Sequence, residues 1–170
     1  MELKEKIVSS YVAFENDVDL NSEIHDIRSE AFHNFEKLGF PTKKLEEWKY
    51  TSLNAVLKND FSIFPNKENT IEFADVKKYF IHDIDTYKIV FIDGKYSSFL
   101  SDTTHDGKDV CLMSSALSKS KYKIVVENYF NKIAKQDNLT SLNTAFANEG
   151  AYIYIPKNVE VEKPIQIINF

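Results

Sequence analysis

The sequence predicts an α+β fold with helices at the N-terminus, a small β-hairpin sheet, and then the first strands of a regular strand series. Three observations indicate this fold. Apolar residues recur at helical spacing in residues 2–38, an Asp-Gly pair divides two β-rich runs in residues 86–101, and apolar residues alternate after Gly150. We therefore expect a helical and α+β domain at residues 1–148, followed by the beginning of a strand solenoid at residues 149–170.

Two amphipathic helices open the chain. The first spans residues 2–15, and its apolar face is made of Leu3, Ile7, Tyr11 and Phe14. Asn21 or Ser22 can cap the second helix, which Gly39 and Pro41 end. Because both helices carry an apolar stripe, we expect them to pack on a common core.

The stretch at residues 39–53, GFPTKKLEEWKYTSL, follows the second helix and holds the only tryptophan. The consecutive carboxylates of Glu46-Glu47 diverge, whereas paired catalysis needs carboxylates that converge from different elements. We interpret the charged residues as a solvated surface. Leu45, Trp48 and Tyr50 are the side chains expected to be buried, with Trp48 anchoring the crossover.

The middle of the chain predicts a hairpin between short helices and a further strand. Short helices are expected at residues 53–57 and 75–80. The run TYKIVFIDGKYSSFLS reads as a hairpin on a two-residue Asp-Gly turn. Pairing outward from that turn puts Phe91 opposite Tyr96, Ile89 opposite Ser98, and Tyr87 opposite Leu100, on the face expected to look inward.

A strand at residues 110–113 and helices at 122–135 and 141–148 complete the first domain. The longer helix carries one apolar stripe, made of Tyr122, Val125, Val126, Tyr129 and Ile133. The shorter helix faces the core with Leu142, Ala145 and Phe146. After Gly150 the apolar pairs recur every six residues, at Ile153/Ile155, Val159/Val161 and Ile165/Ile167.

This six-residue recurrence predicts three short strands in succession. One repeat of a solenoid cannot bury its own apolar face, so several stacked repeats are needed for stability. We therefore expect the segment to be part of a longer protein whose strand series is interrupted at Phe170. In isolation, residues 150–170 should pair through their exposed edges with the chain's own helices or with a second copy as a homodimer.

Composition narrows the classes of function. The 170 residues carry a formal net charge of −5, so we expect neither nucleic acid nor a membrane surface as partner. The N-terminus has no continuous apolar segment, which predicts a cytoplasmic protein. The single cysteine, Cys111, is expected to be a small buried thiol and excludes an internal disulfide.

Motifs of catalysis or metal binding do not occur. The sequence has no phosphate-binding glycine loop, no G-x-S-x-G, no HExxH and no CxxC. His-Asp pairs stand at His25-Asp26, His82-Asp83 and His105-Asp106, but adjacent residues do not face each other on a helix or a strand. We expect surface or capping roles for them.

Three motifs occur in order along the chain. They are R-x-x-A-x-x-x-F-x-x-x-G-F-P-T at residues 28–42, E-E-W-K-Y-T at 46–51, and L-N-x-A-F-A-N-E-G-A-Y-I-Y-I-P at 142–156, which V-E-V-E-K-P-I follows at 159–165. Together they resemble the N-terminal portion of SufD, a SUF-system scaffold subunit of iron–sulfur cluster assembly in the SufB/SufD family. The W-K-Y-T stretch near the N-terminus favours SufD over SufB.

The resemblance implies a scaffold and not an enzyme. Family members have an N-terminal helical region, a central parallel β-helix and C-terminal helices, so the strands after Gly150 would begin a truncated β-helix. The implied partners are SufB and the ATPase SufC, and clusters would be handled transiently by the full complex. No catalytic, cofactor-binding or metal-binding residue is carried over. The matched residues are expected to be structural anchors: Arg28, Gly39, Pro41, Trp48, Tyr50, Asn143, Gly150 and Pro164.

Two other classes of function stay open on the sequence. The six-residue recurrence could open a hexapeptide β-helix acyltransferase, with the helical part as its N-terminal adaptor. The aromatic-rich helical part could also bind a small ligand, although an aromatic core explains the same composition. Cys111 and the scattered histidines do not supply the several soft ligands that a cluster needs, so we expect no cofactor in this segment.

Overall fold

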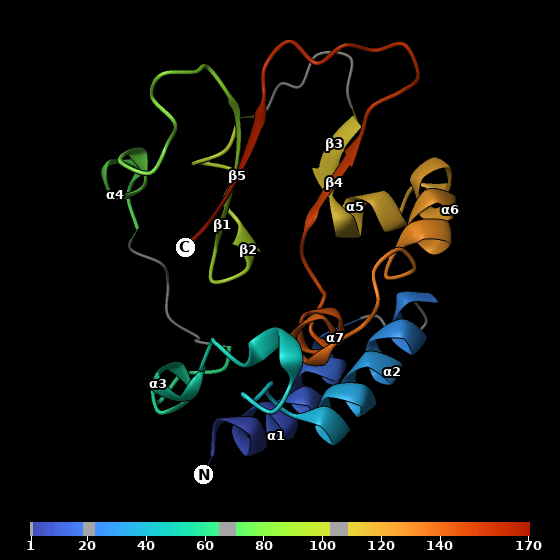
Figure 1. Ribbon diagram of the computed structural model, residues 1–170. Helices are drawn as coiled ribbons and strands as arrows, with labels where there is room; N and C mark the ends of the chain where they lie inside the picture. The colour runs from blue at the N-terminus through green and yellow to red at the C-terminus, as the bar shows by residue number, and fades with distance from the viewer. Residues whose placement is uncertain (1, 19–22, 65–70, 103–108) are drawn as a thin grey trace. The chain divides into compact units, whose positions relative to one another are not determined.

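The computed structural model describes residues 2–18, 23–64, 71–102 and 109–170 (Figure 1). It confirms the α+β class, with helices at the N-terminus and small sheets later in the chain. The chain divides into two compact units, and each is made of two separate stretches of sequence. Unit 1 contains residues 1–65 and 124–148, and unit 2 contains residues 66–123 and 149–170.

Unit 1 is helical, and its core is aromatic. Its elements are α1 (Leu3–Asp17), α2 (Glu23–Leu38), the 3₁₀ turn η1 (Glu46–Trp48), α3 (Asn54–Leu57), the C-terminal part of α6 (Ser120–Tyr129) and α7 (Asn138–Ala145). Tyr11 stacks on Phe32 with ring centroids 3.7 Å apart and meets Phe146 edge to face at 5.5 Å. Phe14, Ala31 and Ala145 complete this buried cluster, so α1, α2 and α7 share one core.

Helix α7 packs along α2, and polar side chains fix their relative position. Asn34 Nδ2 on α2 donates to Gln136 Oε1 at 3.1 Å, and Asn138 Nδ2 donates to the carbonyl of Gly39 at 2.8 Å. Asp137 caps α7 by accepting from the backbone amides of Leu139 and Thr140. Residues about one hundred positions apart in sequence are therefore joined by hydrogen bonds as well as by apolar contact.

Unit 2 contains a three-stranded sheet in the order β2-β1-β5. Its strands are β1 (Tyr87–Ile92), β2 (Lys95–Tyr96) and β5 (Ile165–Asn169). β1 pairs antiparallel with β2 and parallel with β5, in a register that sets Ile89 opposite Ile167. Helix α4 (Phe73–Lys77) contributes Val76 to the core on one face of the sheet. The core there is made of Val76, Phe80, Val90, Ile92, Leu100 and Ile168.

A second, two-stranded sheet belongs to the same unit. β3 (Asp109–Leu112) pairs antiparallel with β4 (Ala151–Tyr154), and Cys111 lies opposite Tyr152. Helix α5 (Met113–Leu117) follows β3 directly, and the backbone amide of Met113 donates to the carbonyl of Gly150 at 2.9 Å. The strand expected at residues 110–113 is therefore present, one residue earlier.

The predicted hairpin is confirmed at its turn. Asp93 and Gly94 both have positive φ, 48° and 76°, as a two-residue type I′ turn requires, and Phe91 pairs with Tyr96. The pairing predicted further from the turn is wrong, because β2 ends at Tyr96. The chain turns back, so that the Ser101 hydroxyl accepts from the Val90 amide at 2.9 Å.

This return also corrects the predicted position of Leu100. Leu100 does not lie opposite Tyr87 but packs with Val90 and Ile92 on the other face. Both faces of β1 are buried, and the face with Val90 and Ile92 is covered by Val76, Phe80 and Leu100, which come from outside the sheet. The face predicted to look inward, with Tyr87, Ile89 and Phe91, is buried as expected, and the opposite face, with Val90 and Ile92, is buried as well.

Two further predictions need correction in the C-terminal half. The helix expected at residues 122–135 ends at Tyr129, Asn131 has φ 57°, and Ile133 is 84% exposed. Strands form at two of the three predicted apolar pairs, but the described residues show no strand at Val159 or Val161. There, a turn with Asn158 at φ 65° reverses the chain. β4 and β5 consequently join different sheets.

The remaining helix predictions hold within a few residues. The first two helices lie at Leu3–Asp17 and Glu23–Leu38, while the predicted cap at Asn21 or Ser22 lies outside the described residues. The short helices expected at residues 53–57 and 75–80 appear as α3 and, two residues early, as α4. The helix expected at residues 141–148 begins at Asn138, because Asp137 supplies the cap.

Candidate functional site

Arg28 and Gly39, two of the eight sequence-selected residues, lie inside or beside the helical core of unit 1. Arg28 is 5% exposed, and its Nη1 donates to the carbonyl of Ala147 at 3.3 Å. Its guanidinium also lies 6.0 Å from the centroid of the Phe14 ring. Gly39 ends α2 with φ 64°, a left-handed conformation that glycine adopts without strain, and its amide donates to the Phe35 carbonyl at 2.7 Å.

The EEWKYT stretch lies at the surface of unit 1. Trp48 is half-buried, but Tyr50 is 90% exposed and Leu45 is 40% exposed, so the expected burial of these two side chains is wrong. The stretch forms only a short 3₁₀ turn, too short to present one apolar face to the core. The charges are solvated, as expected: Lys49 pairs with Glu46 and lies 5.0 Å over the ring of Tyr50.

The other four sequence-selected residues are scattered over both units. Pro41 is buried after the end of α2, and Asn143 is exposed on α7. Gly150 and Pro164 precede β4 and β5, and the Pro164 carbonyl accepts from the Tyr87 amide at 2.8 Å. The structure therefore does not gather the eight residues into one site.

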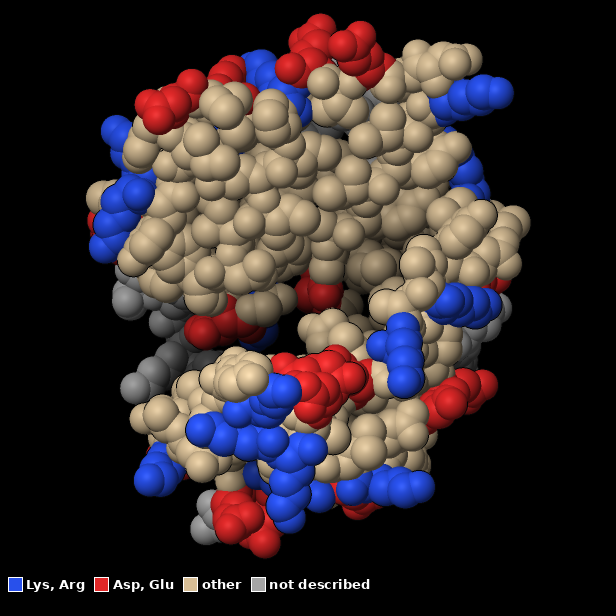
Figure 2. All heavy atoms as spheres, viewed as in Figure 1, with Lys and Arg blue, Asp and Glu red and all other residues tan. Residues whose placement is uncertain are grey.

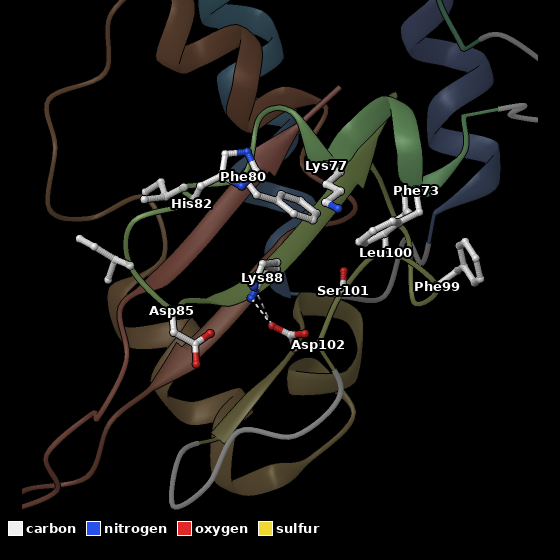
Figure 3. A pocket seen from close by; sticks show the side chains of 12 residues that line it. Phe73, Lys77, Phe80, His82, Asp85, Lys88, Phe99, Leu100, Ser101 and Asp102 are labelled. Carbon is white, nitrogen blue, oxygen red and sulfur yellow. Dashed lines mark hydrogen bonds and ion pairs between the residues drawn. The ribbon is translucent and has the colours of Figure 1, made fainter.

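A pocket of about 460 Å³ lies in unit 2, between α4, β1 and the chain that returns after β2 (Figure 3). No sequence pattern predicted this pocket, because its lining comes from two stretches of chain, residues 73–88 and 99–102, that only the fold brings together. The lining residues are Phe73, Lys77, Phe80, Ile81, His82, Ile84, Asp85, Lys88, Phe99, Leu100, Ser101 and Asp102. Aromatic and aliphatic side chains predominate, with a few ionic groups among them.

Hydrogen bonds and ion pairs hold the charged side chains of the pocket lining in place. The Lys88 amide donates to Asp102 Oδ2 at 2.8 Å, and Lys88 Nζ donates to the carbonyl of Thr86 at 2.9 Å and lies 3.9 Å from the same carboxylate oxygen. Asp85 pairs with Lys163 at 2.5 Å, and this neighbour holds the pKa of Asp85 below its usual value. These ionic groups thus have partners within the unit.

Gln166 fastens the loop that forms one wall of the pocket. From β5, its Oε1 accepts from the Ile81 amide at 3.2 Å and from the Thr86 hydroxyl at 3.3 Å. Its Nε2 donates to the Tyr79 carbonyl at 3.2 Å. A single side chain therefore holds residues 79–86 against the sheet.

Charge is unevenly spread over the face of the molecule drawn in Figure 2. The visible surface of unit 2 is mostly uncharged, whereas acidic and basic side chains are mixed on the visible surface of unit 1. Over the described ranges, no helix has the length and apolar content to cross a bilayer. Those ranges also hold no cluster of three or more His, Cys, Asp or Glu residues suited to a metal ion.

The histidines and the cysteine lie apart from one another. His25 is half-buried on α2, and His82 and Asp83 are both exposed. The His33 Nδ1 donates to the Ser29 carbonyl at 2.7 Å, and Cys111 is half-buried on β3. His105-Asp106 lies outside the described residues.

The chain thus has an α+β fold, and its described residues form no recognised catalytic arrangement. Its family is shown by its sequence. Residues 1–167 match the family described as SufBD protein N-terminal region, so the chain belongs to that family. The resemblance to the N-terminal portion of SufD is confirmed.

Three curated relatives illustrate the similarity. An iron–sulfur cluster assembly SufBD family protein of Synechocystis is 26% identical over 132 residues, which are 77% of this chain and 29% of that protein. The iron–sulfur cluster assembly protein SufD of Bacillus subtilis is 36% identical over 64 residues, 36% of this chain and 15% of that protein. SufD of Escherichia coli is 32% identical over 73 residues, 40% of this chain and 15% of that protein. The chain thus spans less than a third of the length of these relatives.

Proposed function

We propose that this chain is the N-terminal segment of a SufD-like scaffold for iron–sulfur cluster assembly, and that it acts through protein contacts with SufB and SufC. The observation that carries the proposal is the family match, which extends over residues 1–167. The relatives, which are named as iron–sulfur cluster assembly proteins, support the same role. In this proposal the chain performs no catalysis of its own.

The proposal assigns cluster chemistry to the full complex. A cluster needs several soft ligands in convergent geometry, and the whole sequence contains one cysteine. The segment would therefore hold no cofactor and would work in the cytoplasm as one part of a larger assembly. The eight sequence-selected residues would support the fold and not the chemistry.

The architecture beyond this segment is also part of the proposal. Residues 149–170 would lead into a parallel β-helix, with residues 1–148 as the domain before it. The isolated segment would also form a homodimer through residues 150–170, since among the described residues β4 and β5 each pair with one strand and leave one edge open. The hexapeptide acyltransferase alternative gains no support from the comparisons, since residues 1–167 match the SufBD N-terminal region instead.

Co-purification tests the proposal. The full-length protein that contains this chain is expressed with an affinity tag, together with the SufB and SufC counterparts from the same genome. We expect the three proteins to elute as one complex in size-exclusion chromatography. A tagged protein that elutes without both counterparts would refute the role.

A further inference from the structure

The pocket of unit 2 is surrounded by unusually exposed apolar side chains. Phe99 is 81% exposed, Ile84 54%, Ile81 49% and Phe73 47%. Covering such side chains with a partner is favourable, because it removes apolar surface from water. Clusters of exposed apolar side chains therefore mark interaction sites. All four line one pocket, so the exposure is concentrated around a concave surface.

The floor of this pocket is already formed. Phe80 and Leu100 are 7% and 4% exposed and belong to the core cluster of the sheet. Gln166 fastens the wall at residues 79–86, and Ser101 is fixed by hydrogen bonds to Val90 and Ser97. A preformed pocket loses little conformational freedom on binding, and its volume is within the range of ordinary ligand sites.

The charge that remains available in the pocket is positive. Lys88 is engaged by Asp102 and Thr86, and Asp85 is paired with Lys163. Lys77, at the C-terminal end of α4, is exposed, and its ammonium group forms no ion pair or hydrogen bond with any residue in the described ranges. Figure 3 draws Lys77 near Phe73 and Leu100, with Asp85 on the opposite side of the pocket. The complementary group is therefore an anion attached to an apolar side chain.

We propose that this pocket binds an extended segment of a partner protein in which an aromatic or long aliphatic side chain stands within two residues of an Asp or Glu. The apolar side chain rests on Phe80 and Leu100 beneath Phe99, and the carboxylate pairs with Lys77. The choice of a protein partner rests on the proposed function, in which the chain works by contacts within the SufB and SufC assembly. Nothing in the family match itself assigns this pocket.

Photo-crosslinking from the mouth of the pocket tests the proposal. Phe99 is replaced by benzoyl-phenylalanine in the full-length protein, which is mixed with its SufB and SufC counterparts and irradiated. We expect a crosslink, mapped by mass spectrometry, to one segment of a counterpart that carries the apolar and acidic pair. A crosslink to a second copy of this chain, or to a segment without a carboxylate, overturns the proposal.

Binding of the mapped segment, as a labelled synthetic peptide, then tests the two contacts. Lys77→Glu and Phe99→Ala should each weaken binding by about tenfold, which corresponds to the loss of one good contact. The matched controls are Lys78→Glu, whose side chain lies over Tyr79 outside the pocket lining, and Tyr129→Ala, an exposed aromatic outside that lining. Equal effects of Lys77→Glu and Lys78→Glu would refute the pocket.

The outcomes separate this inference from the proposed function. If the complex assembles but Phe99 gives no crosslink, the pocket proposal fails and the scaffold role stands. If no complex assembles, both fail. Circular dichroism of each variant confirms that the fold is retained, so that weaker binding reports the pocket surface.

Discussion

Tyr11 shows how the core of unit 1 controls the ionisation of a single side chain. Its ring is 3% exposed, stacks on Phe32 and meets the edge of Phe146. Burial, and next the negative charge of Glu15, raises the pKa of Tyr11 from 10.0 to about 12. The neutral phenol is therefore the form that the folded chain retains.

This shift predicts a pH-dependent stability. As pH rises from 10.0 to about 12, unfolded Tyr11 loses its proton while folded Tyr11 keeps it, so the free energy of unfolding falls. Tyr11→Phe removes this contribution. We expect the free energy of unfolding of Tyr11→Phe, relative to wild type, to be constant below about pH 9 and to increase above it. Urea denaturation at a series of pH values measures the difference, and a difference independent of pH would contradict the prediction.

In helix α7, the fold likewise changes the pKa of a side chain, and that side chain fixes the start of the helix. The helix is short, and one carboxylate satisfies two of its unpaired N-terminal amides: Asp137 Oδ1 accepts from Leu139 N at 3.0 Å and from Thr140 N at 2.8 Å. These amide hydrogen bonds and the Thr140 hydroxyl hold the pKa of Asp137 below its usual value. The cap thereby fixes where α7 starts beside α2.

Substitution of Asp137 should separate the cap from its charge. Asp137→Ala is expected to lower the free energy of unfolding by about 1 kcal/mol, and Asp137→Asn by less, because asparagine also caps helices. The advantage of aspartate over asparagine should be present above pH 3.8, the ordinary pKa of aspartate, and should be lost as pH falls through the depressed pKa of Asp137. Chemical denaturation at pH 7 and pH 3 checks both points. An undiminished advantage at the lower pH would contradict the assignment.

The wall of the pocket depends on strand β5 through Gln166. Gln166→Leu removes the acceptor for the Ile81 amide and the Thr86 hydroxyl, so residues 79–86 should open more often. We expect hydrogen exchange in that segment to become about tenfold faster. Asn169→Leu, an exposed change on the same strand, is the control and should leave this segment unchanged. Equal exchange in wild type and Gln166→Leu would show that the wall is held by other contacts.

At the scale of the whole molecule, the two units are interleaved in sequence. Residues 124–148 return to the helices of unit 1, and residues 149–170 return to the sheets of unit 2. The parallel pairing of β1 with β5 joins positions far apart in the chain. Unit 1 is therefore complete only with residues 124–148, and unit 2 only with residues 149–170.

A core substitution should reveal this interleaving. Val90 on β1 is fully buried in one cluster with Val76 of α4 and Ile168 of β5. Val90→Ala should lower the free energy of unfolding by about 1–3 kcal/mol, because it leaves a cavity in this core. Hydrogen exchange should rise both in residues 87–102 and in residues 165–169, because they share one sheet. Val12→Ala, at a side chain 65% exposed, is the control. An effect confined to residues 87–102 would contradict the shared core.

The sequence by itself determined the local elements and the family. Helical spacing placed α1 and α2, the Asp-Gly pair placed the hairpin turn, and three ordered motifs indicated the SufD-like N-terminal portion. These features depend on residues close together in the chain, whose spacing and backbone preferences act locally.

Only the tertiary structure decided how the distant pieces join. β5 completes the sheet of β1, β4 pairs with β3, Tyr50 is left exposed, and the pocket is assembled around Lys77 and Phe99. The physical reason is that strand pairing and burial depend on which distant surface covers a residue, and period-two alternation alone does not specify the partner strand. The candidate interaction site therefore appeared only when these stretches were brought together.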